Sequence, residues 1–232
     1  MKRLSINRYL DHAVLKPELD QKQTIEAIES GLEYEVRTVC VRPADIKTAQ
    51  DICKGSNTEV SCVLSFPHGV ALSASKADEA SRYVQLGVSE IDMEANYGLI
   101  CSGQWDRVRA DIEAVSKVAK PANVLLKVIL ETAALDLDQI VRATQIAVQA
   151  KADFVKTSTG FAWDGASEEA VQTMLETANG RIGVKASGGI RDRQRAELFV
   201  DMGCARLGVG FTSTPIICAG SGADSKDSSQ GY

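Results

Sequence analysis

The sequence has few of the residues from which metal and redox sites are built. Its 232 residues include only two histidines, His12 and His68, and none of its six cysteines forms a CxxC pair. Cysteines scattered in this way, without a histidine cluster, argue against a zinc site and against a disulfide scaffold. They fit small buried side chains in a protein of the reducing cytoplasm.

Long apolar runs and clusters of one charge are also missing. No apolar run reaches the roughly 18 residues of a membrane-spanning helix, and the basic start "MKRLSINRYLDH" lacks the apolar core of a secretory signal. The formal net charge is −5, and lysine and arginine form no patch. These absences argue against a membrane or a nucleic acid as the main partner. The composition, 44% hydrophobic and 25% charged, is typical of a soluble globular protein.

Short apolar runs alternate with helical patterns along most of the chain. Eight runs rich in β-branched and aliphatic residues are expected as strands buried on both faces, at residues 9–15, 36–41, 59–66, 89–95, 124–131, 153–159, 181–187 and 205–211. Helices are expected between them at residues 21–34, with a break near Gly31, and at 73–87, 104–119, 137–150, 167–178 and 192–203. Pro43 can occupy the first turn of a further helix after the second strand.

Eight strand–helix units in this order predict a parallel sheet with right-handed crossovers. Such units close naturally into a (β/α)8 or TIM barrel of this length, so the predicted class is α/β with a single barrel domain at residues 1–218. An open doubly wound sheet is the alternative, but the G-x-G-x-x-G that often follows its first strand is missing. Residues 219–232 are small and polar and are expected to form a flexible tail.

Lysines occur inside three successive apolar runs, at Lys127, Lys156 and Lys185. They are spaced 29 residues apart, which predicts matching positions on three neighbouring strands. If they face the interior, they converge with Asp92 of the fourth strand at the C-terminal mouth, where such barrels place their chemistry. One such lysine is usually a solvated rim residue, but like charges in a partly desolvated site favour the loss of one proton. A neutral, desolvated lysine is the nucleophile of Schiff-base enzymes.

Six motifs spread over nearly the whole chain resemble those of deoxyribose-phosphate aldolases, a family of class I aldolases with (β/α)8 barrels. They are "LDH" at 10–12, "VCVRP" at 39–43, "EIDM" at 90–93, "LLKVILET" at 125–132, "DFVKTSTGF" at 153–161 and "GVKASGGIR" at 183–191. The resemblance implies that Lys156 forms the Schiff base and that Lys185 favours its neutral form. It implies that Asp92 completes a proton relay with Lys185. It also implies a substrate pocket lined by Asp11, Cys40 and Lys127.

The activity implied by the resemblance is the reversible cleavage of 2-deoxy-D-ribose 5-phosphate to acetaldehyde and D-glyceraldehyde 3-phosphate. It needs no metal or other cofactor, because the iminium formed on Lys156 supplies the positive charge. Barrels commonly bind a phosphate with the loops after strands seven and eight. These loops carry glycine pairs, Gly188 with Gly189 and Gly208 with Gly210. The first pair precedes a helix whose N-terminus favours an anion.

Several positions depart from the family pattern. Ala13 replaces the threonine that usually follows Asp-His, and Ser65 replaces the glycine that usually precedes Phe-Pro. Glu94 and Ala95 stand where an aliphatic pair usually follows "EIDM", so a second carboxylate is expected to approach the relay. After the last strand, "GVGFTS" at 208–213 replaces a serine-rich loop, which puts the affinity for phosphate in question.

The last residue, Tyr232, follows a glycine in the polar tail. Members of the family often end in a terminal tyrosine that folds over the site and assists proton transfer, so the resemblance implies a catalytic role for Tyr232. Two other interpretations stay open. One is a Schiff-base aldolase for another aldehyde or an unphosphorylated sugar, and the other is a catalytically weak barrel that acts as a binding protein. The expected partner is a small molecule in each case, and a homodimer is the assembly considered.

Overall fold

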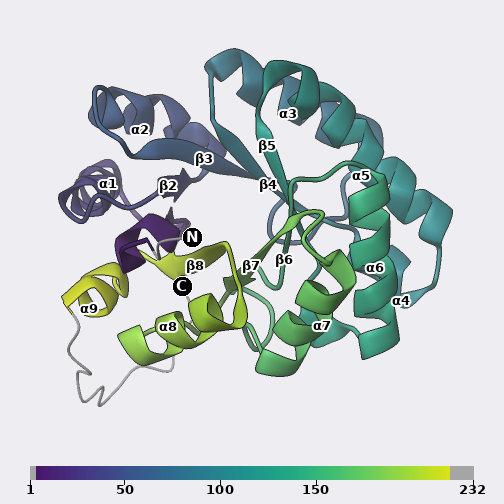
Figure 1. Cartoon of the computed structure of the whole chain (residues 1–232). Helices are drawn as coiled ribbons and strands as arrows, with labels where there is room; N and C mark the ends of the chain where they lie inside the picture. Colours follow the sequence, from purple (N-terminus) through teal and green to yellow (C-terminus); the bar gives the residue numbers. More distant parts are fainter. Residues whose placement is uncertain (1–3, 220–232) are drawn as a thin grey trace.

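A closed barrel of eight parallel strands forms the centre of the computed structural model, which describes residues 4–219 (Figure 1). The strands pair in chain order, and β8 closes the barrel against β1. Their bounds are β1 Leu10–Val14, β2 Thr38–Val41, β3 Glu59–Leu64, β4 Glu90–Glu94, β5 Leu125–Ile129, β6 Phe154–Lys156, β7 Gly183–Ser187 and β8 Arg206–Gly210. The expected barrel and its eight strands are confirmed, and each strand is shorter than the apolar run that predicted it.

Helices surround the barrel (Figure 1). Their bounds are α1 Gln21–Glu33, α2 Ile46–Cys53, α3 Ser73–Leu86, α4 Tyr97–Cys101, α5 Trp105–Ala119, α6 Leu137–Gln149, α7 Glu168–Ala178, α8 Arg193–Met202 and α9 Thr214–Ala219. Short 3-10 turns lie at Ile6–Tyr9, Pro43–Asp45, Lys120–Ala122 and Thr132–Ala134. The six expected helices and the turn at Pro43 are confirmed. No helix within residues 4–219 is both long enough and apolar enough to cross a membrane.

Two short helices, α4 and α9, are missing from the sequence-based expectation. They have five and six residues, too few to show a helical period. Helix α9 ends at Ala219, one residue past the expected boundary between barrel and tail. The rest of the expected tail, including Tyr232, lies outside the described residues.

Gly31 does not break its helix, so that expectation is wrong. Helix α1 continues through Gly31 to Glu33, and Gly31 is buried. A Cβ atom at this position would lie 2.8 Å from Cγ1 of Val39 and 3.1 Å from Cδ2 of His12. The glycine therefore lets α1 pack closely against β1 and β2, a packing role that the sequence pattern of a helix breaker does not reveal.

The two faces of the strands bury different kinds of side chain. Outward residues pack against the helices and form the main apolar core of the protein. His12 belongs to this outer face, because its Nε2 donates to the carbonyl of Ala27 in α1 and its Nδ1 accepts from the Thr214 hydroxyl in α9, each at 2.8 Å. Inward residues alternate with them along each strand. In this barrel many of the inward residues are charged.

Candidate active site

Ion pairs join a set of charged side chains inside the barrel. Along β4, Glu90 and Asp92 face inward, since both contact Lys127 of β5. The ion pairs within the set span 2.5–4.0 Å, and every member is buried. This set, which we call the ion cluster, consists of Asp11, Glu90, Asp92, Lys127, Lys156, Lys185 and Arg206.

The three lysines of the cluster do not lie at one level, which corrects the expectation from their equal spacing. Lys156 lies opposite Lys185 across β6 and β7. Lys127, however, lies opposite Phe154, two residues before Lys156, and on its other side opposite Asp92. Closing a barrel requires a stagger between strands, and a shift of two residues keeps a side chain on the same face. Lys127 therefore faces inward as expected, but deeper in the barrel than Lys156.

Lys127 is enclosed by carboxylates. Its Nζ lies 2.5 Å from Oε2 of Glu90, 2.8 Å from Oδ1 of Asp92 and 2.9 Å from Oδ2 of Asp11. Burial alone would lower the pKa of Lys127, but the carboxylates of Asp11, Asp92 and Glu90 hold it well above the usual value. A lysine held in the charged form by three partners has no lone pair with which to attack a carbonyl carbon. Lys127 therefore fits a structural and electrostatic role.

Lys156 has the poorest charge compensation of the three lysines. Its Nζ contacts one carboxylate oxygen, Oδ2 of Asp92, at 3.0 Å, and lies 5.8 Å from the ring centre of Phe66. Lys185 contacts the same oxygen at 2.7 Å and also Oδ2 of Asp11 at 2.6 Å. Asp92 thus connects Lys156 to Lys185, as a proton relay requires.

Two acids of the cluster, Asp92 and Asp11, are held in their charged form. Burial acts to raise the pKa of Asp92, but the ammonium groups of Lys127, Lys185 and Lys156 hold it well below the usual value. The pKa of Asp11 is likewise lowered, because Lys127, Lys185 and Arg206 outweigh the effect of its burial. Four cationic side chains thus face three carboxylates. The cluster therefore carries more cationic than anionic side chains, and Lys156 has the fewest carboxylate contacts among its lysines.

Hydroxyl groups of neighbouring strands orient Asp11. The Thr38 hydroxyl donates to Oδ1 of Asp11 at 3.0 Å, and Ser61 donates to the Thr38 oxygen at 3.2 Å. Cys40, which follows on β2, is buried with Ala13 and other apolar side chains of β1–β3. Burial raises the pKa of the Cys40 thiol. A neutral thiol there can line a pocket, but its role in binding substrate stays a prediction.

Gly188 and Gly189 follow β7 as expected, but the expectation for the second pair is wrong, because Gly208 lies in the middle of β8 and Gly210 is its last residue. Gly188 and Gly189 have positive φ angles of 83° and 73°, and a Cβ at Gly189 would meet no atom within 4 Å. A Cβ at Gly208 would lie 2.5 Å from Oγ of Ser187 and 3.0 Å from Cε of Lys185. The lack of a side chain at Gly208 thus gives Lys185 room to reach Asp11 and Asp92.

The start of α8 is not the open anion site that the sequence suggests. Asp192 caps the helix, and its carboxylate accepts from the backbone N–H of Arg195 at 2.8 Å. A second anion at the same helix end would be repelled by this carboxylate. The role of Gly188, Gly189, Gly208 and Gly210 in phosphate binding stays a prediction, and it depends on the loop backbone rather than on the helix end.

Two members of the ion cluster, Glu90 and Arg206, are missed by sequence reasoning. Arg206 contacts Glu90 at 2.9 Å across the barrel interior. Strand alternation contained a signal for Glu90, because it lies two residues before Asp92 and shares its face. Arg206 offered no such signal, since it begins β8 at the edge of its apolar run.

A second pair of acids, Glu94 and Glu131, lies nearer the mouth, and we call them the mouth carboxyls. Glu94 ends β4 opposite Ile129, whose other neighbour across the sheet is Lys156. The expected approach of a second carboxylate to the relay is confirmed to this extent. Burial, followed by the Glu131 carboxylate, raises the pKa of Glu94 well above the usual value, although Lys156 and Lys76 oppose the shift. Burial also raises the pKa of Glu131, against its hydrogen bonds from Thr159.

Among residues 4–219, no group of three or more histidine, cysteine, aspartate and glutamate side chains is arranged to hold a metal ion. All six cysteines lie within the described part of the chain, where they are free thiols.

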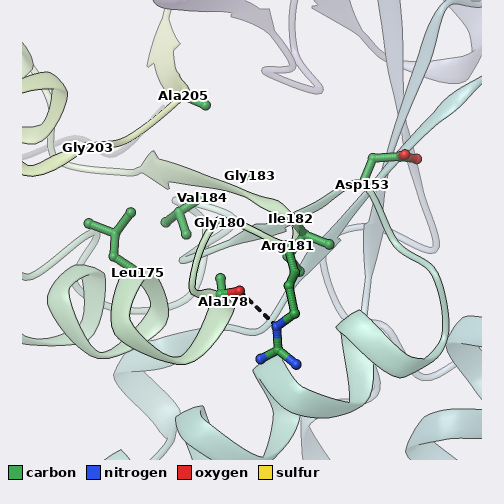
Figure 2. A pocket seen from close by; sticks show the side chains of 10 residues that line it. All are labelled: Asp153, Leu175, Ala178, Gly180, Arg181, Ile182, Gly183, Val184, Gly203 and Ala205. Atoms are coloured by element: carbon green, nitrogen blue, oxygen red, sulfur yellow. Dashed lines mark hydrogen bonds between the residues drawn. The ribbon is translucent and has the colours of Figure 1, made fainter.

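Figure 2 shows a surface hollow of about 420 Å³, and none of the three lysines is among the residues that line it. Asp153 and Gly183, at the starts of β6 and β7, line it together with Leu175, Arg181 and Ala205. This is the opposite end of the strands from the mouth carboxyls. Arg181 is fixed there by a hydrogen bond from its Nε to the carbonyl of Ala178 at 3.1 Å. The hollow contains none of the predicted site residues, so the ion cluster remains the candidate active site.

Comparison with known proteins identifies the family. Residues 6–205 match the model of the DeoC/LacD family aldolases. The chain is 42% identical to deoxyribose-phosphate aldolase 1 of Staphylococcus aureus (strain MSSA476) over 205 residues, which cover 88% of this chain and 92% of that protein. It is 42% identical to the deoxyribose-phosphate aldolase of Lactiplantibacillus plantarum over 206 residues, covering 89% of this chain and 96% of the relative. A solved structure described as QR15, an aldolase, superimposes with a TM-score of 0.86 at 35% identity, covering 93% of this chain and 95% of that one. The protein belongs to the DeoC/LacD family of aldolases.

Proposed function

We propose that this protein is a deoxyribose-phosphate aldolase that cleaves its sugar through a Schiff base on Lys156. The observation that carries the proposal is the unequal compensation of the buried lysines. Lys127 has three carboxylate partners and Lys185 has two, whereas Lys156 has one, in a cluster with an excess of positive charge. The relatives that are 42% identical carry the name of this activity.

The proposed cleavage needs only proton transfers and electron movement within the substrate. The neutral amine of Lys156 attacks C1 of the open-chain sugar, and loss of water leaves an iminium. The C2–C3 bond then breaks, its electrons move toward the iminium, and the C3 hydroxyl loses its proton to become the aldehyde of glyceraldehyde 3-phosphate. The remaining enamine takes a proton at carbon, and water releases acetaldehyde and the free amine. Lys185 and Asp92 are proposed to carry protons to and from Lys156, because Lys156 and Lys185 both contact Oδ2 of Asp92.

Phosphate recognition is proposed for the loops after β7 and β8. Backbone N–H groups around Gly188, Gly189 and Gly210 would hold the phosphate, and the positive φ angles of the first two permit close approach of a ligand. Asp192 already caps α8, and this favours a second candidate, an aldolase whose sugar carries no phosphate. Comparing cleavage of 2-deoxyribose 5-phosphate with that of 2-deoxyribose distinguishes the two.

The chain outside the described residues is also part of the proposal. Tyr232 is proposed to assist protonation of the enamine carbon, and Tyr232→Phe should slow both sugar cleavage and exchange of the acetaldehyde methyl protons by roughly tenfold or more. Unchanged rates for both reactions would remove Tyr232 from the mechanism.

We further propose a cytoplasmic enzyme, supported by its unpaired cysteines. We also propose a homodimer, which gel filtration with light scattering can test.

Trapping with borohydride tests the central step. With acetaldehyde present, the wild-type protein should gain one ethyl group, located by mass spectrometry on Lys156. Lys156→Ala should lose both this modification and sugar cleavage, while Lys22→Ala, which removes a lysine 85% exposed on α1, should behave as wild type. Turnover close to normal in Lys156→Ala would overturn the proposal.

A further inference from the structure

Three of the four oxygens of the mouth carboxyls lack hydrogen-bonding partners within residues 4–219. Glu94 is fully buried, and neither of its carboxyl oxygens makes a hydrogen bond within residues 4–219. The same is true of Oε1 of Glu131 and of the Ser158 hydroxyl. Since roughly 90% or more of buried polar groups in folded proteins are paired, these atoms can pair with hydroxyl or amine groups of a bound molecule.

These unpaired atoms belong to residues at the C-terminal ends of β4, β5 and β6, the end of the barrel toward which Lys156 lies. Glu94 ends β4, Glu131 follows β5, and Ser158 lies two residues after Lys156 beyond the end of β6. Lys156 acts on the ionisation of both carboxyls, lowering the pKa of each against the effect of burial. A molecule joined to Lys156 would therefore have the unpaired oxygens beside its first carbons.

An aromatic pair and a loop lie close to the mouth carboxyls. Tyr97 packs edge to face against Trp163, with ring centres 5.6 Å apart, and the two mouth carboxyls raise the pKa of Tyr97 further than its burial does alone. The loop after β3 closes on Glu94, because a Cβ at Gly69 would lie 2.8 Å from Cγ of Glu94.

The opposite wall is apolar. Residues of β1–β3 and the loop that follows form a small cluster there, made of Ala13, Leu15, Cys40, Val63 and Phe66. The ring of Phe66 faces Nζ of Lys156 at 5.8 Å. This wall suits a methyl group, whereas the mouth carboxyls suit a hydroxyl group. The phosphate is proposed to bind toward β7 and β8. The substrate carbons next to the Schiff base would then lie on the side of the mouth carboxyls.

We propose that Glu94 and Glu131 form a hydroxyl-binding subsite beside Lys156, so that a 2-hydroxyaldehyde can replace acetaldehyde as the nucleophilic partner in the aldol reaction. This inference rests on the proposed Schiff-base function of Lys156. It assigns a use to Glu94, which stands where the family resemblance implies an aliphatic residue. A protonated Glu94 both donates and accepts a hydrogen bond, which matches a hydroxyl group.

The reaction is balanced without any further reagent. The Lys156 amine adds to the carbonyl carbon of glycolaldehyde, and water leaves to give the iminium. C2 loses one proton and becomes the nucleophile, with its hydroxyl group held by the mouth carboxyls. C2 then forms a bond to the acceptor's carbonyl carbon, whose oxygen takes up a proton. Water finally releases Lys156 and an aldose that keeps the hydroxyl at C2.

Hydrogen exchange in deuterated water tests directly whether glycolaldehyde reacts as the nucleophilic partner. The rates for the C2 hydrogens of glycolaldehyde and the methyl hydrogens of acetaldehyde are compared by NMR, with Lys156→Ala as the background. The wild-type protein should exchange both. In Glu94→Val the ratio of glycolaldehyde to acetaldehyde exchange should fall roughly tenfold, the effect of one hydrogen bond. Glu94→Gln, whose amide still donates and accepts, should keep most of the ratio.

Stability and a matched control separate binding from structural damage. Glu94→Val removes an unpaired buried carboxyl from a strand, so its melting temperature should rise; Glu29→Val makes the same change at an exposed position of α1 and should not alter the ratio. The inference is overturned if wild-type protein exchanges acetaldehyde but not glycolaldehyde, or if Glu94→Val keeps the wild-type ratio. If acetaldehyde itself neither exchanges nor becomes trapped on Lys156, the proposed function fails, and the inference fails with it.

Discussion

The ion cluster and the mouth carboxyls are both buried acidic sites in one barrel, but their charge states differ. Asp92 contacts three lysines and Asp11 two, and the pKa of each acid is lowered. Glu94 makes no ion pair within the described residues, and burial raises its pKa. Burial alone therefore does not decide whether an acid in this barrel is charged. The number of cations in contact decides it.

The same comparison holds for the lysines. Lys127, surrounded by carboxylates at the bottom of the cluster, is held in the charged form, while Lys156 lies between the cluster and the mouth with one carboxylate contact. Lys156, the lysine proposed to form the Schiff base, thus lies at the edge of the ion cluster that is nearer the mouth carboxyls. In a Schiff-base reaction such a lysine acts in its neutral form, so a site with few carboxylate contacts suits it.

The largest expected effect comes from breaking the ion cluster. Lys127→Met removes the ammonium group but leaves Asp11, Glu90 and Asp92 buried, so the free energy of unfolding should fall by about 3–5 kcal/mol. The matched variant is Lys47→Met, which breaks an exposed ion pair with Asp51 at 2.8 Å and should cost less than about 1 kcal/mol. Urea denaturation of both variants at neutral pH gives the comparison. Equal losses would mean that the buried pairs contribute no more than surface pairs.

A smaller effect should follow from moving Lys185 within the cluster. Gly208→Ala places a methyl group against Oγ of Ser187 and Cε of Lys185, and overpacking of this kind costs about 1–3 kcal/mol. Because Lys185 contacts both Asp11 and Asp92, turnover should fall more than the loss of stability explains. Gly180→Ala is the control, since φ there is positive but no atom lies within 4 Å of the added carbon. It should lose stability while keeping turnover.

Sequence reasoning predicts the barrel well because each strand can be recognised in the sequence as a short apolar run. Each run is buried on both faces, and the period of strands and helices identifies the units in order. The inward direction of Lys127, Lys156 and Lys185 follows from the same alternation. Their level does not follow from it. Lys127 lies two residues deeper than equal spacing suggests, because the stagger between neighbouring strands is a property of the closed barrel and not of any one strand.

Contacts between distant residues explain what sequence reasoning missed. Gly31 is indistinguishable from a helix breaker until His12 and Val39 are placed against it. Arg206 can be recognised as part of the ion cluster when it is seen to contact Glu90, which lies 116 residues away in the chain. Glu94 departs from the family pattern in the sequence, but its lack of partners depends on the loop at Gly69 and on the pairing of β4 with β5. Each of these requires the folded structure.

The smallest expected effect tests the mouth carboxyls through pH. The pKa of Glu94 is raised in the folded protein, so the folded state binds more protons than the unfolded state between the unfolded value of about 4.5 and the folded value. Stability should therefore fall as pH rises through this window. Glu94→Gln has no proton to lose. Its free energy of unfolding should be close to that of the wild type at pH 4 and should exceed it increasingly toward pH 8.

The size of this gain is about 1.4 kcal/mol for each unit by which the pKa is raised. The charged and titratable groups that face Glu94 are Glu131, Lys156, Lys76 and Tyr97, and all four are present in both proteins. The ion cluster works in the opposite direction, because the lowered pKa of Asp11 and Asp92 favours folding above about pH 4. Urea denaturation at intervals from pH 4 to pH 8, with Glu29→Gln as the exposed control, measures the difference. A gain that stays constant with pH would show that Glu94 does not change its charge in this range, and that the mouth is not the unpaired region that the comparison with the ion cluster describes.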